Sequence, residues 1–184
     1  MKEFVTQALV LGVRSLGESD RAADLFTLAL GRCEARMVAG RAIVSKFAPH
    51  TDPLNLLTVR LVKKGRYTLA DAVAENRFPV LRRSAKAFAE ALEAFFALKV
   101  LIPKEEPDPR LFHEVCRALT RGRLTTDHIL SLLGYEPREA RCDRCRKPAV
   151  RYFIPRDGVF FCGACSKGMS DEVVLQVTTS HYGS

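Results

Sequence analysis

Two pairs of cysteines place the strongest constraint on how this chain can fold. Cys142 and Cys145 form one C-x2-C pair, Cys162 and Cys165 form a second, and sixteen residues separate the pairs. This spacing is typical of a structural zinc site with four thiolate ligands. A short C-x2-C turn directs both of its thiolates at one ion, and two such turns complete a tetrahedral shell. The pattern therefore predicts a structural Zn²⁺ held by these four cysteines.

The segment between the cysteine pairs predicts a small β-hairpin. Residues 151–154 and 159–161 are short apolar stretches on either side of a Pro-Arg-Asp-Gly turn, so the whole module is interpreted as a zinc ribbon. Four thiolates leave no open coordination position, so the metal should hold shape and not activate water. Disulfides and a redox C-x2-C are the alternatives. They are disfavoured because the chain shows no signal peptide and no βαβ pattern around the cysteines.

The charge of the chain is unevenly distributed along its 184 residues. The formal net charge is +8, and no apolar run is long enough to span a membrane. Residues 1–78 carry 12 Lys/Arg and 8 Asp/Glu, residues 79–137 carry 9 and 8, and residues 138–184 carry 8 and 5. The basic excess at the two ends indicates a polyanionic partner, most simply nucleic acid, although a basic surface kept for solubility is the alternative. A cytoplasmic location is expected.

The first part of the chain predicts a small β-barrel. Strand-like stretches occur at residues 8–14, 33–38, 54–62 and 67–73, whereas residues 21–30 fit a helix or a strand equally well. Gly-containing turns separate these stretches, including a basic turn at residues 63–66. Five short strands within about eighty residues fit an OB-fold, and an SH3-like barrel remains nearly as compatible with the periodicity.

Helical periodicity replaces strand periodicity at Pro79. Apolar residues recur at three- and four-residue steps over residues 80–102, which predicts one amphipathic helix. A second helix is predicted from Asp108-Pro109 to Gly122, and a third from Thr125 or Thr126 to Gly134. The expected α+β organisation is an OB-fold domain at 1–78, a helical domain at 79–137, a zinc module at 138–177 and a disordered tail at 178–184.

A basic set within residues 30–66 is predicted to contact nucleic acid. Only Glu34 and Asp52 oppose it in sequence, and in a barrel its members would fall on neighbouring strands and loops. Such phosphate contacts give affinity that depends on salt and carries no sequence readout. The set comprises Arg32, Arg36, Arg41, Lys46, Arg60, Lys63, Lys64 and Arg66. Phe47 and Tyr67 could stack on bases, but core or rim packing is the simpler interpretation.

Other polar residues have simpler structural interpretations, with one exception. Arg144 and Arg146 flank the first cysteine turn and could reach outward to DNA or to a partner. Glu18 and Asp20 lie in a turn, where they should cap backbone amides or pair with Arg14 or Arg21. The remaining cysteines, Cys33 and Cys116, are read as ordinary semi-buried thiols.

Three enzyme motifs are only partly matched, and each lacks a residue that its chemistry requires. The stretch from His113 resembles a zinc-protease H-E-x-x-H, but Arg117 replaces the second histidine. Residues 163–168 have the spacing of a P-loop, yet Met169 stands where the phosphate-binding lysine is required. No H-x-E accompanies the cysteines, so the zinc-deaminase pattern is also missing. The chain is therefore not expected to be an enzyme.

Several short motifs give the chain a family resemblance. Gly17 to Asp20, Leu25 to Thr27, Gly31-Arg32, Ala39-Gly40-Arg41 and Ser45-Lys46 resemble the N-terminal barrel of the bacterial recombination mediator family RecO. The order of barrel, helices and four-cysteine module also fits, over about residues 5–177. The chain is shorter than typical members after the zinc module, so no docking site for a partner tail is carried over.

The resemblance implies an OB-fold protein that binds single- and double-stranded DNA and anneals complementary strands. The implied partners are RecR, single-stranded DNA-binding protein and RecF, with no membrane association, no nucleotide cofactor and a nucleoid-associated cytoplasmic location. Two alternatives remain open at this point. One is an adaptor whose zinc ribbon mainly docks a protein partner, and the other is an RNA-binding OB/zinc protein.

Overall fold

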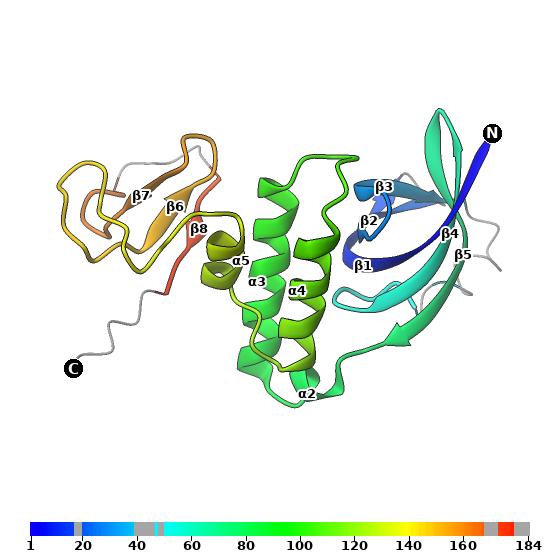
Figure 1. Ribbon diagram of the computed structural model, residues 1–184, viewed down its shortest axis with the longest axis horizontal. Helices are drawn as coiled ribbons and strands as arrows, with labels where there is room; N and C mark the ends of the chain where they lie inside the picture. The colour runs from blue at the N-terminus through cyan, green and yellow to red at the C-terminus, as the bar shows by residue number, and fades with distance from the viewer. Residues whose placement is uncertain (17–19, 39–46, 48–49, 168–172, 179–184) are drawn as a thin grey trace.

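The molecule is an elongated row of three parts (Figure 1). A β-barrel lies at one end, a group of helices lies in the centre, and a small three-stranded sheet lies at the other end. The computed structural model describes residues 1–16, 20–38, 47, 50–167 and 173–178. No helix within these ranges is long and apolar enough to cross a membrane.

The barrel contains five strands and the central part contains four helices among the described residues. The barrel strands are β1 (Lys2–Leu16), β2 (Asp20–Thr27), β3 (Gly31–Met37), β4 (Leu56–Lys64) and β5 (Arg66–Asn76). The helices are α2 (Pro79–Arg82), α3 (Ala85–Leu101), α4 (Pro109–Thr120) and α5 (Thr126–Leu132). The small sheet contains β6 (Tyr152–Ile154), β7 (Val159–Phe161) and β8 (Leu175–Gln176).

The barrel closes in the order β1-β2-β3-β5-β4, which is the OB-fold topology and confirms the predicted fold. All pairs are antiparallel except β3 with β5, which are parallel and meet only at Ala35–Tyr67 and Arg36–Thr68. Most of the ambiguous stretch at residues 21–30 belongs to the strand β2, and residues 28–30 form the turn that follows it. Its periodicity was uninformative because both faces are buried: Leu25 points into the barrel, whereas Phe26 packs outside it.

The first barrel strand is longer than its apolar stretch suggests. It begins at Lys2 and not at residue 8, because its first half pairs along β4 from Lys63 onward. A register shift near Gly12 lets the same strand turn from β4 to β2. The strand predicted from residue 54 begins instead at Leu56. Leu54 has φ +69 and is fully buried, so it ends the preceding loop and does not extend the strand.

The single helix predicted for residues 80–102 is wrong, because the structure breaks it at Ser84. Ser84 has extended backbone angles, and its side chain accepts a hydrogen bond from the Ala87 amide at 3.2 Å, so it begins α3 as an N-cap. The preceding turn, α2, is therefore separate. The second and third helices begin as predicted, since the side chains of Asp108 and Thr125 cap α4 and α5.

One apolar cluster connects all three parts of the molecule. A second cluster fills the barrel interior, but the larger one joins the outer barrel face to the helices and to the small sheet. Phe26 of β2 meets Phe112 of α4 edge to face, with ring centroids 5.4 Å apart. At the other end, Phe153 of β6 lies 4.7 Å from Tyr135 and 4.8 Å from Phe160. The predicted boundaries at residues 78 and 137 stay predictions, since apolar packing is continuous across both.

The loop between α3 and α4 is fastened to the barrel at β3. The Glu105 amide donates to the Arg32 carbonyl at 2.8 Å, and Lys104 forms a parallel bridge with Arg32. Gly31 has φ +67, and a Cβ there would lie 2.0 Å from the Glu106 carbonyl oxygen. A glycine is therefore required at this position, both for its backbone angles and for the close approach of the loop.

Candidate metal centre and nucleic-acid interface

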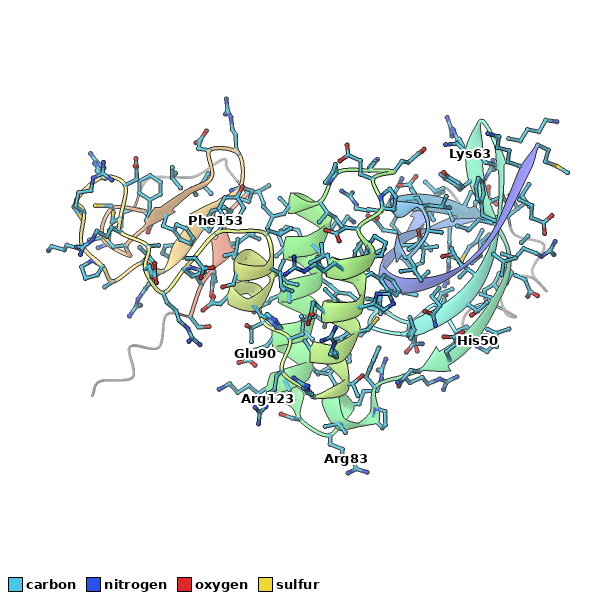
Figure 2. The ribbon with its side chains drawn as sticks, viewed as in Figure 1. His50, Lys63, Arg83, Glu90, Arg123 and Phe153 are labelled. Atoms are coloured by element: carbon cyan, nitrogen blue, oxygen red, sulfur yellow. The ribbon has the colours of Figure 1, made fainter. Side chains whose placement is uncertain are left out.

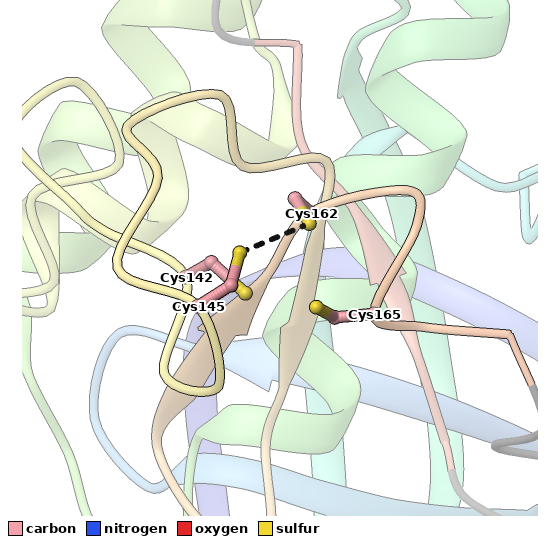
Figure 3. A group of neighbouring side chains, drawn as sticks. All are labelled: Cys142, Cys145, Cys162 and Cys165. Carbon is pink, nitrogen blue, oxygen red and sulfur yellow. Dashed lines mark hydrogen bonds between the residues drawn. The ribbon is translucent and has the colours of Figure 1, made fainter.

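The four cysteines converge at one point of the small sheet (Figure 3). Their Sγ atoms all lie within 4.8 Å of one another, and Cys145 and Cys162 are 3.7 Å apart. In a tetrahedral ZnS4 centre with Zn–S bonds of ~2.3 Å, neighbouring sulfurs are separated by about 3.8 Å. The four-cysteine cluster can therefore bind a metal ion, and its spacing suits a tetrahedral shell of thiolates.

Backbone hydrogen bonds shape both cysteine turns. The Arg146 amide donates to the Cys142 carbonyl at 2.8 Å, and Arg146 takes a positive φ of 60° to close the first turn. In the second turn, the Cys165 amide donates to the Cys162 carbonyl at 3.1 Å. The Asp143 amide donates to the Phe160 carbonyl at 2.8 Å, which ties the first turn to β7. The two turns are thus held in register by the same sheet.

The protonation of the cysteines reflects the crowding of four sulfurs. Burial acts to raise the pKa of Cys142, but amides of Cys162, Cys145 and Arg144 stabilise its thiolate and lower its pKa to about 6. Hydrogen bonds with Cys145 and Cys162 raise the pKa of Cys165 to about 12. One thiol therefore keeps its proton while a neighbour loses its own. A bound cation would displace the remaining thiol protons and allow all four sulfurs to be thiolates.

Aromatic packing attaches this centre to the helices. Tyr135 lies directly after α5 and contacts both Phe153 of β6 and the turn at Gly158, where an added Cβ would lie 3.5 Å from its ring. Beyond β8, the Thr178 amide donates to Asp127 of α5 at 3.0 Å. A change at the four-cysteine cluster would therefore disturb a sheet that is linked to α5.

Most described members of the predicted basic set are paired with carboxylates. On the barrel, Arg36 binds Asp20, Arg60 binds Glu3 at 3.1 Å, and Lys63 binds Glu105 at 2.5 Å. Arg41 and Lys46 lie outside the described residues. Lys64 and Arg66 remain exposed at the tip of the β4–β5 hairpin and make no ion pair within the described chain. These two side chains are the most available of the set for a phosphate.

Arg32 is mostly buried, and its side chain makes contacts that hold the fold together. Its side chain is 14 % exposed, and it donates to Asp24 at 3.2 Å and to the Ile102 carbonyl at 3.4 Å. Asp24 is 12 % exposed and also accepts from Lys99 of α3 at 3.1 Å. The three charges tie β2 and β3 to α3, so Arg32 is placed to hold the barrel against the helices.

Lys63 lies in a small polar network near the hairpin tip. Its ammonium group lies 4.5 Å from the centre of the Tyr67 ring and donates to the Tyr67 hydroxyl at 3.2 Å. Hydrogen bonding to Glu105 is the main cause that raises the Lys63 pKa above its ordinary value. The lysine therefore stays charged, but Glu105 competes with any phosphate for it.

The other predicted contacts have mixed outcomes. Phe47 and Tyr67 are buried, as core packing requires, so neither ring offers an open stacking surface. Asp20 pairs with Arg36, a partner that the sequence did not indicate, while Glu18 lies outside the described residues. Arg144 and Arg146 are exposed beside the first cysteine turn. Their contact with DNA or with a partner stays a prediction.

Comparison with known proteins matches this architecture to one family. The family model "Recombination protein O N terminal" matches residues 1–76, which contain the whole barrel. The DNA repair protein RecO of Cutibacterium acnes is 31% identical over 185 residues, covering 90% of this chain and 75% of the relative. This chain belongs to the RecO family. The RecO proteins of Geobacter metallireducens and Pelobacter propionicus are 28% and 29% identical and cover 91% and 87% of the chain.

The RecO resemblance stated from short motifs is thus confirmed over most of the chain. Those motifs could not reveal the carboxylate partners of the basic residues. Glu3 reaches Arg60 only through the β1–β4 register, and Glu105 reaches Lys63 only through the loop fastened to β3. The one available signal was the presence of acids on strands and loops that a five-stranded barrel brings together.

Proposed function

We propose that this RecO-family chain is a non-catalytic mediator of recombinational DNA repair. It would bind single- and double-stranded DNA through phosphate contacts and anneal complementary strands. Family membership carries this proposal, because the relatives that match most of the chain are DNA repair proteins by name. The exposed Lys64 and Arg66 at the hairpin tip support it, since cations without acidic partners bind phosphate without losing an existing ion pair.

Annealing follows from charge neutralisation in this proposal. Two complementary strands repel each other through their phosphates, and bound cations reduce this repulsion so that bases can meet. The described barrel residues would contact the DNA backbone and leave the bases free. Phe47 and Tyr67 are buried in the barrel and offer no surface on which bases could stack. Pairing between the strands would then supply the sequence specificity.

We infer that the four-cysteine cluster holds Zn²⁺ in a structural role. Cys142, Cys145, Cys162 and Cys165 would supply four thiolates and leave no position for a water molecule. The ion would fix the two cysteine turns and the sheet between them. The ion would therefore contribute to the free energy of folding.

The partners and location follow from the same proposal. RecR is the expected co-worker, and single-stranded DNA-binding protein and RecF are further expected partners at the nucleoid. Domain limits near residues 78 and 137 also belong to this proposal. A pull-down with each purified partner, with and without DNA, tests these assignments separately.

An adaptor function is the second candidate, and one observation favours it. Four of the predicted DNA-contacting bases, Arg32, Arg36, Arg60 and Lys63, already have carboxylate partners. A barrel of this kind would bind DNA weakly and leave the ribbon, with Arg144 and Arg146, to dock a protein. An RNA-binding protein is the remaining alternative.

A fluorescence assay of oligonucleotide annealing across a salt titration tests the proposal. Complementary DNA strands and matching RNA strands are run in parallel with the full chain. Accelerated DNA annealing that falls steeply with salt supports the mediator function. Tight binding without annealing favours the adaptor, a preference for RNA favours the third candidate, and absence of binding at low salt rejects the proposal.

A further inference from the structure

Basic side chains gather at one end of the helical part, away from the barrel tip. The group, termed here the helix-end cluster, comprises Arg77, Arg82, Arg83, Lys86, Arg117, Arg121 and Arg123. All seven are exposed. Figure 2 shows Arg83 and Arg123 at this end, whereas Lys63 lies at the opposite edge of the view.

The fold brings the cluster together from two separate parts of the chain. Residues 77–89 contain no Asp or Glu, and neither do residues 115–126. α3 leaves this end and α4 returns to it, so the start of one helix meets the end of the other (Figure 1). Gly122 confirms the contact, because a Cβ there would lie 3.4 Å from Val80 of α2. Of the acids of residues 79–137, Glu105, Glu106 and Asp108 lie in the loop at the other end of the helices, whereas Glu90, Asp127 and Glu136 line a pocket beside the cluster together with Lys86 and Arg123.

Three members of the cluster are not ion-paired in the described part of the chain, although Arg123 lines a pocket together with Glu90, Asp127 and Glu136. Within the described ranges, Arg83, Arg121 and Arg123 make no ion pair. Lys86 has only a distant contact of 3.8 Å with Glu90, and Arg117 pairs with Glu114 on its own helix. Three guanidinium groups are therefore free to bind an anion without breaking an existing ion pair.

Other members hold the platform in place. Arg82 donates to the Asn55 side chain at 2.9 Å and to the Arg77 carbonyl at 2.7 Å, and it lies over the Phe88 ring. These contacts link α2 to the loop before β4 and to α3. The free arginines are thus carried by helices and a short turn whose positions are fixed by packing.

The orientation of α3 adds to the positive potential. This helix of 17 residues begins at Ala85 within the cluster, so its N-terminal dipole points toward the same surface. Ser84 caps the Ala87 amide. Helix dipole and side chains therefore act in the same direction.

We propose that the helix-end cluster binds the phosphate backbone of a nucleic-acid segment, separately from the barrel tip. Six of its seven bases are arginines, whose planar donors suit phosphate oxygens. Exposed charges spread over an open end suit a continuous polyanion, which supplies a phosphate at each nucleotide. A protein with two such surfaces can hold two DNA segments at once, and Lys64 and Arg66 provide the other surface.

Charge reversal of the free arginines tests this inference. The variant Arg83→Glu/Arg121→Glu/Arg123→Glu of the full chain is compared with Lys64→Glu/Arg66→Glu. One measurement is the affinity for a labelled duplex across a salt series. The other is energy transfer between donor- and acceptor-labelled duplexes that are not complementary, which reports bridging.

The triple variant should lose bridging by at least about 10-fold, and its slope of log affinity against log salt should fall by about 0.9 per lost phosphate contact. Arg110→Glu is the matched control for the single variant Arg121→Glu, because it makes the same charge change at the opposite end of α4 and should match the unaltered chain. Unchanged melting temperature confirms that each variant is folded.

Three outcomes would overturn the inference. Unchanged affinity and bridging in the triple variant would leave the proposed barrel function standing alone. Equal losses for Arg110→Glu and Arg121→Glu would show that only overall charge matters. Loss of binding to a labelled poly-glutamate peptide, with DNA binding intact, would make the surface a peptide site. Conversely, a defect in the triple variant with none in Lys64→Glu/Arg66→Glu would support the inference and reject the barrel assignment.

Discussion

The barrel and the end of the helical part carry similar numbers of basic residues but differ in how many of them are ion-paired. On the barrel, Arg36, Arg60 and Lys63 each face a carboxylate from a neighbouring strand or loop. At the helix end, Arg83 and Arg121 make no ion pair within the described chain. The difference teaches that a count of bases along a sequence does not measure the charge available to a ligand. The availability is set by which strands, helices and loops meet in space.

The largest expected effect is on the stability of the ribbon and leaves both basic regions unchanged. Cys142→Ser removes one proposed zinc ligand, and we expect the ribbon to lose more than about 5 kcal/mol of unfolding free energy, because metal binding supplies its folding energy. Metal content and limited proteolysis of residues 142–165 measure this effect. DNA binding at the barrel tip and helix end should persist.

Cys116→Ser is the matched control for this experiment. Its thiol lies outside the cluster, and burial raises its pKa to about 12, so it should not bind metal. Full zinc content in Cys142→Ser, or equal losses in both variants, would contradict the proposed metal centre.

The next effect concerns the charges that join the two regions. Asp24→Ala leaves the mostly buried Arg32 and the more exposed Lys99 without their shared partner. We expect a loss of about 3–5 kcal/mol in unfolding free energy, since an unpaired buried charge is costly. Urea denaturation measures it. Asp52→Ala removes an exposed carboxylate and should change stability by less than about 0.5 kcal/mol. Similar effects of both changes would mean that Asp24 is not essential for this junction.

A smaller effect is expected where the loop crosses β3. Gly31→Ala should cost about 2–4 kcal/mol, because the new Cβ would lie 2.0 Å from the Glu106 carbonyl oxygen and the backbone angle is unfavourable. Gly65→Ala has a similar positive φ but no atom within 4 Å of its Cβ, so only about 1 kcal/mol of backbone strain is expected. Thermal unfolding of the two variants isolates the contribution of the loop contact. An equal loss of stability in the two variants would exclude a contribution from the loop contact.

The smallest effect tests the comparison most directly. Glu105→Gln removes the carboxylate that pairs with Lys63, so the barrel should gain one available cation. DNA affinity should rise about 2–3-fold, and the salt slope should steepen by up to about 0.9. The Lys63 pKa should also fall toward its ordinary value, because a neutral amide replaces the carboxylate that accepts its hydrogen bond. Nitrogen NMR follows the pKa, and fluorescence anisotropy follows the affinity.

The neighbouring Glu106→Gln makes the same charge change without touching Lys63. The DNA affinity of Glu106→Gln should therefore rise less than that of Glu105→Gln. Equal gains in Glu105→Gln and Glu106→Gln would show that long-range charge, and not pairing with Lys63, controls binding at the barrel.

The features set by nearby residues were predictable. The spacing of Cys142 to Cys165 predicted the cluster, and caps such as Asp108 predicted where helices begin. Barrel strands with one buried face were also recognisable. By contrast, β2 was ambiguous because helices cover its outer face and erase the alternation.

The features that depend on distant residues were not predictable. Lys63 and Glu105 are separated by 42 positions in the sequence, and their contact needs both the barrel and the loop between α3 and α4. Averaging the charge over residues 79–137 also concealed the helix-end cluster, because some of the acids, such as Glu105 and Glu106, lie at the other end of the helices. Even a local feature failed at Ser84, where a helix-compatible apolar pattern continued through a capping residue.

The loop between α3 and α4 also covers a strand edge at which two molecules could otherwise pair. β3 pairs with β5 at only two positions, so the first half of its outer edge would expose unpaired backbone groups. The bridge between Arg32 and Lys104 and the Glu105 amide occupy that edge. A strand from another molecule would have to displace them before it could extend the barrel. Gly31, by allowing the loop to approach, keeps the part of the β3 edge that β5 does not pair with covered.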